Sequence, residues 1–178
     1  MPGDREGRRM DGPAREYLPH SSGCFCCGDE NACGVRARFF VEGDAVNAEV
    51  VLPRHLNGYR NVAHGGVLAA LLDESMGWAA TVFGRAHPMY VTAELTVKYI
   101  RPVPVGGQIR IVSRLLEDAG RIAYGAGELL CGGKVCVKAS GKFIPMSPEG
   151  TAEVIPYLKF GECRKYRTLF GRAGKEKS

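Results

Sequence analysis

The first half of the chain contains two short runs in which apolar and polar residues alternate. Apolar residues occupy every second position over 35–41, and the same pattern returns over 46–52. The residues between them, Glu42-Gly43-Asp44, are typical of a tight turn. Since alternation with a period of two indicates a half-buried strand, the two runs predict an antiparallel hairpin.

A long apolar segment follows over residues 66–83. It has no proline and few β-branched residues, which favours a helix, and bulky apolar residues lie almost all around it. One side carries small residues, with Asp73 among them: Gly66, Ala69, Ala70, Gly77, Ala80 and Gly84. We therefore expect a sheet to enclose the helix on one side and another element to approach it closely on the other.

The second half of the chain predicts an antiparallel sheet. Alternation is clearest over 91–99, and three more candidate strands follow at 108–117, 121–131 and 134–144. Tight turns join these last three, and short connections join antiparallel neighbours. Together with the hairpin, the pattern predicts an α+β fold in which a sheet of about six strands wraps around one long central helix.

The segments that flank this domain differ from it in composition. We expect a mobile leader over residues 1–20, which hold few sizeable apolar groups, and one domain over 21–146. A basic C-terminal extension follows over 147–178, where Pro156 and Gly161 interrupt any long helix.

Composition and charge exclude several classes of protein. The chain has 178 residues, 45% of them hydrophobic and 24% charged, which suits one globular domain. Its net charge of +5 comes mostly from residues 153–178, which hold seven basic and three acidic side chains, so we expect no nucleic-acid-binding face. No uncharged apolar stretch reaches the roughly 18 residues of a membrane span, and the charged first 16 residues lack the apolar core of a signal peptide. A cytoplasmic protein is expected.

Seven cysteines without a secretion signal favour reduced thiols. Four of them, Cys24, Cys26, Cys27 and Cys33, lie within ten residues. They could bind zinc with Cys163 or His20 completing the set, but the spacing lacks the two C-x2-C pairs of well-defined zinc modules. Buried free thiols are favoured, and neither a metal nor a cofactor is expected.

Two features of the predicted helix could carry chemistry. His64-Gly65-Gly66 lies at its start, where unpaired backbone N–H groups can hold a developing oxyanion. Asp73 follows six apolar residues, and a carboxylate there either reaches solvent or has a function. Glu74 is a second acid, but adjacent helical residues point about 100° apart, and the small-residue side favours Asp73.

The spacing of these features indicates how the protein assembles. Asp73 is eight residues beyond Gly65, so the two lie roughly 12 Å apart along one helix. They cannot both attend one carbonyl, whose reacting partner must lie within about 3–3.5 Å. If both act in one reaction, the carboxylate comes from an antiparallel second copy of the helix. A symmetric dimer with two sites at its interface meets this demand.

The chain resembles the hot-dog-fold acyl-CoA thioesterases, particularly the phenylacetate-pathway-type and thioesterase-superfamily-member-4-like groups. The resemblance rests on the His64–Gly77 segment, on the strand that begins at Val91, and on the Cys24-x-x-Cys27-Gly28 stretch. It implies hydrolysis of acyl-CoA by a homodimer, often paired into a tetramer, without a cofactor.

The resemblance also implies roles for individual residues. Asp73 matches the catalytic carboxylate, Gly65 and Gly66 match the N–H donors to the thioester carbonyl, and His64 lies beside them. Thr92 matches a hydroxyl that positions the water or the carboxylate, and Lys98 and Arg121 fall where relatives contact substrate, which suits phosphates of coenzyme A. Many relatives carry an Asn or Gln before the histidine, and neither Asn57 nor Asn61 matches that spacing cleanly.

Other functions leave weaker traces. The sequence has no G-x-S-x-G, P-loop or G-x-G-x-x-G motif, and it lacks the Asp and His five residues apart that hydratases of the same fold use. The different-class alternative is a non-catalytic acyl-CoA-binding sensor or scaffold, although the leader is too short and polar for a DNA-binding helix-turn-helix.

Overall fold

The computed structural model describes residues 15–85, 89–161, 163 and 165–166. The strands are β1 (Glu16–Tyr17), β2 (His20–Ser21), β3 (Phe39–Glu42), β4 (Ala45–Val51), β5 (Asn57–Tyr59), β6 (Val62–Ala63), β7 (Tyr90–Tyr99), β8 (Gln108–Asp118), β9 (Ala123–Cys131), β10 (Lys134–Pro145) and β11 (Leu158–Lys159). The helices are α1 (Gly65–Phe83), α2 (Pro148–Val154) and two short 3₁₀ helices, η1 (Arg54–Leu56) and η2 (Ile155–Tyr157).

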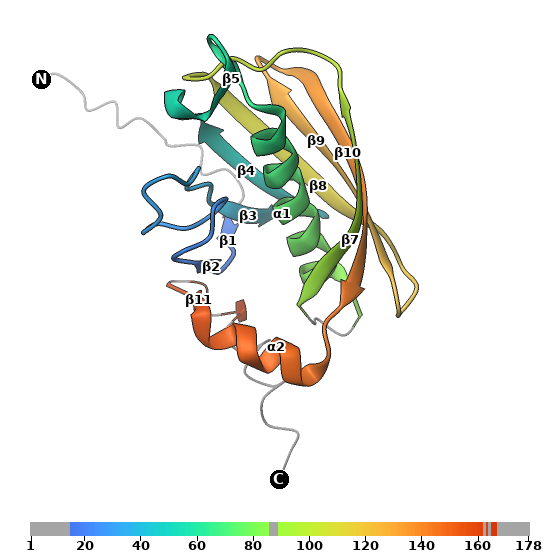
Figure 1. The fold of residues 1–178 in the computed structure, drawn as a ribbon. Coiled ribbons are helices and arrows are strands. Elements are labelled where there is room, and N and C mark those ends of the chain that lie inside the picture. The colour runs from blue at the N-terminus through green and yellow to red at the C-terminus, as the bar shows by residue number, and fades with distance from the viewer. Residues whose placement is uncertain (1–14, 86–88, 162, 164, 167–178) are drawn as a thin grey trace, which may run out of the picture.

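A large antiparallel sheet wraps around α1 (Figure 1). Its seven strands run in the order β1-β3-β4-β8-β9-β10-β7. This is the predicted α+β hot-dog arrangement, and the predicted hairpin is confirmed by the β3–β4 register, in which Phe39 lies opposite Ala48. The strand expected from Arg121 begins at Ala123, because the turn after β8 extends to Ile122, whose carbonyl accepts the Ala119 N–H.

The core forms where α1 packs on the sheet. Leu71, Leu72 and Met76 are fully buried on the helix. Glycine on β9 makes this close packing possible, since a Cβ at Gly127 would lie 3.0 Å from Leu72 Cδ2 and 2.5 Å from the Ser113 hydroxyl. The opposite side of α1, with its small residues, is covered less completely.

The ends of the described chain depart from the expected leader. Tyr17 pairs with Phe40 in the sheet and Leu18 is fully buried, so the fold includes residues that were expected in a mobile leader over 1–20. The reason is that Leu18 packs in the hydrophobic core, and the mostly polar residues around it in the sequence give no indication of this burial. Residues 1–14 lie outside the described part of the chain.

The C-terminal extension packs against the N-terminal segment. Helix α2 begins after Ser147, whose hydroxyl accepts the Gly150 N–H at 3.1 Å, and it gives way to η2 near Pro156 as the sequence indicates. Strand β11 then pairs with β2, opposite His20 and Ser21, so segments from the two ends of the sequence lie side by side (Figure 1). Residues 167–178 lie outside the described residues.

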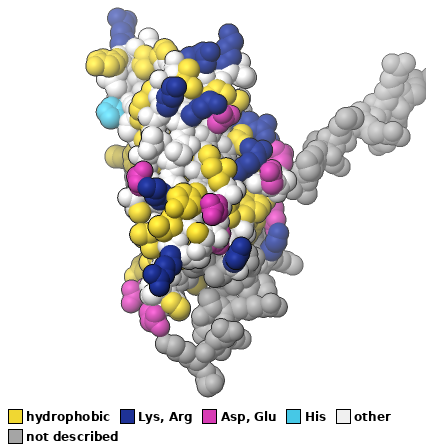
Figure 2. All heavy atoms as spheres, turned by 90° about the vertical axis from the view of Figure 1, so that its right-hand side faces the viewer, with side chains coloured by type: hydrophobic (Ala, Val, Ile, Leu, Met, Phe, Trp, Pro, Cys, Tyr) yellow, Lys and Arg dark blue, Asp and Glu magenta, His cyan; other side chains and the backbone are white. Residues whose placement is uncertain are grey.

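Strand β7 forms one edge of the sheet. Figure 2 shows the right-hand side of Figure 1, where hydrophobic side chains lie between Lys, Arg, Asp and Glu. Cross-strand ion pairs occur on β10, where Lys142 lies 2.6 Å from Glu94 and Lys138 lies 2.7 Å from Glu128. No helix among the described residues is long and apolar enough to cross a membrane.

Candidate active site

The start of α1 is shaped by His64 and two glycines. The His64 Nδ1 accepts the Gly66 N–H at 3.0 Å, so the side chain caps the helix. On the other side, the Tyr99 hydroxyl donates to the Gly65 carbonyl at 2.8 Å. A Cβ at Gly65 would lie 3.2 Å from the Tyr99 hydroxyl, which explains why glycine fits here.

This cap changes the expected pair of backbone donors. Gly66 was expected to offer its N–H to a carbonyl, but its N–H is already engaged by His64. The Gly65 N–H donates to no acceptor among the described residues, and it precedes the repeating helical hydrogen bonds. Within one chain, Gly65 is therefore the better placed of the two donors.

The helix start opens into a cavity of about 600 Å³. It is lined by Gly58, Tyr59, Val62, Ala63, His64, Gly65, Leu68, Tyr99, Ile100, Arg101, Pro102 and Val103. Apolar walls with a few polar groups suit an organic ligand.

Asp73 and Thr92 meet one another farther along the helix. The Thr92 hydroxyl on β7 donates to the Asp73 carboxylate at 2.7 Å. Both line a second cavity of about 350 Å³, together with Ser21, Cys24, Cys27, Glu74, Gly77, Trp78, Thr81, Met89, Tyr90, Val91, Val154 and Leu158. The last two belong to the C-terminal extension, which thus forms part of this wall.

The two cavities share no lining residue. His64 and Gly65 line the first, whereas Asp73 and Thr92 line the second. Within one chain, the candidate carbonyl donor and the candidate carboxylate are therefore separate, as their spacing along the helix predicts.

The two candidate phosphate ligands also lie apart in one chain. Lys98 on β7 precedes Tyr99, which contacts the start of α1. Arg121 is in the turn after Asp118, whose carboxylate accepts the Arg85 N–H at 2.8 Å just beyond the end of α1. The 19 residues of α1 separate these regions, so a single chain does not bring Lys98 and Arg121 together.

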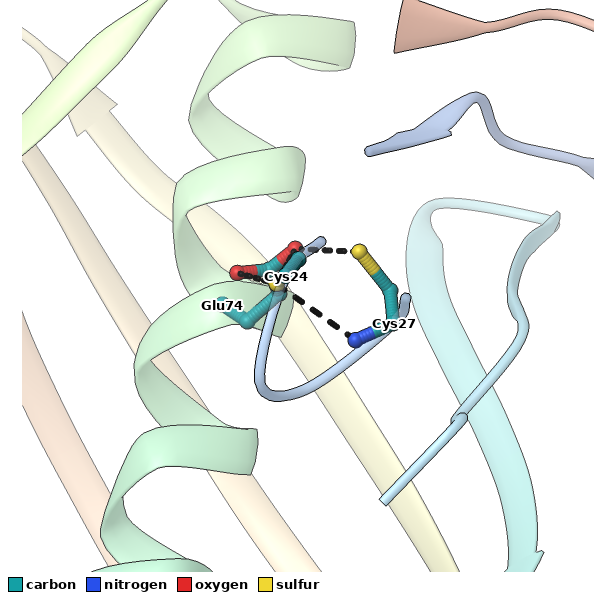
Figure 3. Close-up of side chains that lie close together, drawn as sticks. All are labelled: Cys24, Cys27 and Glu74. Carbon is teal, nitrogen blue, oxygen red and sulfur yellow. Dashed lines mark hydrogen bonds between the residues drawn. The ribbon is translucent and has the colours of Figure 1, made fainter. Parts of the chain in front are cut away.

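Two thiols and a carboxylate, from Cys24, Cys27 and Glu74, form a cluster (Figure 3). All three residues line the second cavity together with Asp73. The Cys27 Sγ lies 3.1 Å from Glu74 Oε1, and the Cys24 Sγ lies 3.7 and 3.8 Å from the two Glu74 oxygens. Both adjacent acids line the second cavity, and, as expected for neighbouring helical residues, they point to different partners. Asp73 contacts Thr92 on β7, whereas Glu74 contacts the cysteine loop.

The cluster perturbs its own ionisable groups. Side-chain hydrogen bonds with Cys26 and Cys27, and to a smaller extent the backbone N–H groups of both residues, lower the pKa of Cys24 well below the usual range of a thiol. Burial, followed by the nearby negative charge of Cys24, raises the pKa of Glu74 to about 7. The pKa of Cys27 is raised by its hydrogen bond to Cys24 and by burial. The surroundings of Cys24 therefore favour its thiolate form.

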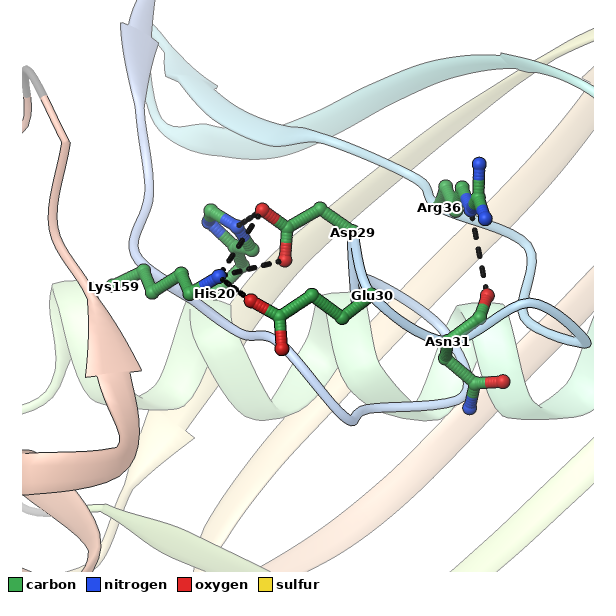
Figure 4. A network of polar contacts seen from close by, with 6 residues as sticks. All are labelled: His20, Asp29, Glu30, Asn31, Arg36 and Lys159. Carbon is green, nitrogen blue, oxygen red and sulfur yellow. Dashed lines mark hydrogen bonds and ion pairs between the residues drawn. The ribbon is translucent and has the colours of Figure 1, made fainter.

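A charged network fastens the C-terminal extension to the same loop (Figure 4). Lys159 on β11 lies 3.3 Å from Asp29 and also pairs with Glu30, while the buried His20 Nε2 lies 3.3 Å from Asp29. The pKa of Asp29 is lowered by His20 and then by Lys159. In the same loop, Asn31 accepts the Cys33 N–H at 3.0 Å.

Some of these contacts carried a sequence signal and others did not. The C-x-x-C-G pattern was visible, but its partner Glu74 lies 47 residues beyond Cys27 and could not be assigned from spacing. Tyr99 occupies an ordinary strand position, so nothing in the pattern marked its contact with Gly65.

Comparison with known proteins defines the class of this fold and site. The thioesterase superfamily model matches residues 60–137. "Putative esterase PA0474" of Pseudomonas aeruginosa is 32% identical over 110 residues, which cover 59% of this chain and 81% of that protein. The chain therefore belongs to the thioesterase superfamily.

Other relatives show how far the likeness extends. The uncharacterized Schizosaccharomyces pombe protein C26H8.11c is 35% identical over 98 residues, covering 52% of this chain and 55% of that protein, so the match spans about half of its length. The crystal structure of a thioesterase superfamily protein has a TM-score of 0.64 at 30% identity, over 69% of this chain and 60% of that one. Escherichia coli PaaI, from the phenylacetic acid degradation operon, shares the fold with a TM-score of 0.59 at 16% identity, over 67% of this chain and 86% of that one.

Proposed function

We propose that this protein hydrolyses acyl-CoA thioesters to free acid and coenzyme A, at two equivalent sites on a homodimer interface. Membership of the thioesterase superfamily supports thioester hydrolysis. The observation that carries the proposal is the Asp73 carboxylate, held at 2.7 Å by Thr92 in a cavity wall, on the same helix whose start exposes Gly65 to a second cavity.

The roles of the residues follow from their chemistry. The Gly65 N–H at the positive end of the helix would polarise the thioester carbonyl, and His64 holds the loop in place through Gly66. Asp73 from the partner chain would act on the carbonyl carbon or on the attacking water, with Thr92 orienting it. Hydrolysis places the water oxygen on the acyl group, and the coenzyme A sulfur leaves and takes up a proton.

Dimer formation is supported by the edge strand. Strand β7 is ten residues long and pairs only with β10 among the described residues, so its other edge has unpaired backbone groups. Val91 is 49% and Tyr99 is 52% exposed in the single chain. Long exposed edges are rarely left uncovered, and a second copy of β7 would continue the sheet. Two such dimers would form the tetramer.

A symmetric dimer could also bring together the two candidate phosphate ligands, Lys98 and Arg121. Lys98 and Arg121 lie toward opposite ends of α1 in one chain, so they could approach one coenzyme A only when they come from different chains. Both side chains suit phosphate recognition, and we propose that they bind the nucleotide part of the substrate.

The decisive experiment measures coenzyme A release from short-chain, long-chain and aromatic acyl-CoAs. Free coenzyme A is quantified by chromatography, because the protein's seven cysteines would react with thiol reagents. Wild type is compared with Asp73→Asn and with Asp44→Asn, which removes a carboxylate that is 81% exposed on a distant turn. We expect turnover in wild type and Asp44→Asn and its loss in Asp73→Asn.

Two results would contradict the proposal. Activity retained in Asp73→Asn would remove Asp73 from the mechanism. A folded wild-type dimer that binds acyl-CoA without hydrolysing any member of the panel would identify a sensor or scaffold instead.

A further inference from the structure

The cluster of Cys24, Cys27 and Glu74 has the composition and size of a metal site. One ligand atom from each of these residues lies within 4.8 Å of the other two. Two thiolates and one carboxylate are ligands that zinc accepts in proteins. We propose that these three residues bind a zinc ion, which was not expected from the cysteine spacing alone.

The distances agree with a tetrahedral centre. With Zn–S of about 2.3 Å and Zn–O of about 2.1 Å, a sulfur and an oxygen ligand are about 3.6 Å apart. Glu74 Oε1 lies 3.8 Å from the Cys24 Sγ and 3.1 Å from the Cys27 Sγ. A shift of about half an ångström in one side chain is enough to admit the ion between them.

The backbone around Cys24 is shaped for a negatively charged sulfur. Two N–H groups point at Cys24 Sγ, that of Cys26 at 3.3 Å and that of Cys27 at 3.5 Å. The turn closes with the Gly28 N–H on the Cys24 carbonyl, and a Cβ at Gly28 would lie only 2.4 Å from that oxygen. The tight turn fixes both thiols on one side of the loop before any ion binds, which lowers the entropic cost of binding.

The other ligand and its surroundings come from α1. Glu74 lies on the central helix and is only partly exposed, and Trp78, one turn farther along, lines the same cavity. Because Cys24, Cys27 and Glu74 all line the second cavity, the fourth position of the ion faces that cavity, where solvent can occupy it. The ion would join the cysteine loop to the wall that contains Asp73.

The test measures zinc in the reduced full-length protein. The protein is stripped with a chelator, incubated with zinc alone, desalted and analysed by mass spectrometry for metal content. We expect one zinc per chain in wild type. Replacement by cobalt should give the intense near-ultraviolet absorption of a thiolate-bound ion.

Variants identify the ligands. Cys27→Ser and Glu74→Gln should each weaken zinc binding at least tenfold, since loss of even an outer hydrogen-bond partner typically costs about 10–100-fold. Cys33→Ser is the matched control, because Cys33 is an exposed thiol of the same loop that does not belong to the cluster. It should bind zinc like wild type.

A second measurement uses the wild-type protein, so it does not depend on whether the variants fold. Zinc should protect Cys24 and Cys27 from alkylation, measured peptide by peptide, and leave Cys33 reactive. The proposal is overturned if reduced wild type retains no zinc, or if Cys33→Ser loses as much zinc as Cys27→Ser. Neither result depends on acyl-CoA hydrolysis, so the metal site and the proposed enzymatic function succeed or fail separately.

Discussion

Replacement of Thr92 by valine tests how the candidate carboxylate is held. Valine keeps the branched shape of threonine and removes the hydroxyl that donates to Asp73 at 2.7 Å. A hydrogen bond to a charged group contributes about 1.5–3 kcal/mol, and the lower value applies because Asp73 is only partly buried. If the bond orients the carboxylate for reaction, its loss should lower kcat about tenfold, since about 1.4 kcal/mol corresponds to a factor of ten.

The assay is steady-state release of coenzyme A from the best acyl-CoA of the panel. We expect KM to change little, because Thr92 is assigned to orientation of the carboxylate and not to substrate binding. Thr92→Ser should restore most of the activity because it returns the hydroxyl. Thr96→Val is the matched control, since Thr96 lies on the same strand, opposite Ser140, whereas Thr92 supplies the hydrogen bond to Asp73.

Two results would refute this reasoning. If Thr92→Val and Thr96→Val had equal effects, the hydroxyl of Thr92 would have no special role. If Thr92→Val raised KM tenfold and left kcat unchanged, Thr92 would contribute to binding and not to the orientation of Asp73.

Three further predictions concern substrate binding and stability. Arg121→Ala should raise KM severalfold with kcat unchanged, and an unchanged KM would remove Arg121 from phosphate binding. Ser113→Ala should lower the free energy of unfolding by about 1–3 kcal/mol in urea titrations, because it removes the partner of Ser75 in a buried 2.5 Å hydrogen bond. Replacing both serines by alanine should lower the free energy of unfolding by less than the sum of the two single changes. Hydrogen bonds from the backbone N–H groups of Arg85 and then Gly120 lower the pKa of Asp118 in the folded protein. The ionised carboxylate therefore stabilises the fold above its unfolded pKa of about 4. This stabilisation is lost as the pH falls through the lower pKa of the folded state. Asp118→Asn should therefore destabilise the protein at pH 7 by at most about 1 kcal/mol, and by less at pH 2.

Controls for these predictions use the same measurements. Circular dichroism and gel filtration establish that each variant folds and assembles like wild type. An additive double serine variant would show that the two hydroxyls do not act as a pair, and an Asp118→Asn effect that is as large at pH 2 as at pH 7 would contradict the assignment to charge.

Much of the fold could be predicted because apolar residues recur with different periods in strands and in helices. The alternation in β3, β4 and β7 to β10 and the long apolar run of α1 are local patterns, and local patterns are visible in a sequence. The short strands β1, β2 and β11 were missed, because two residues cannot show a period and their pairing depends on partners far along the chain.

The central helix, the succession of antiparallel strands and the separation of Gly65 from Asp73 all follow from local sequence patterns, since the rise per residue fixes distances along a helix. The contacts between side chains that are far apart in the sequence depend instead on how the chain packs in three dimensions. This packing places Thr92 against Asp73, His64 against Gly66, and Glu74 beside Cys24 and Cys27. The difference is physical: a helix fixes the spacing of its own residues, whereas packing around a shared core selects the neighbours that come from elsewhere in the chain.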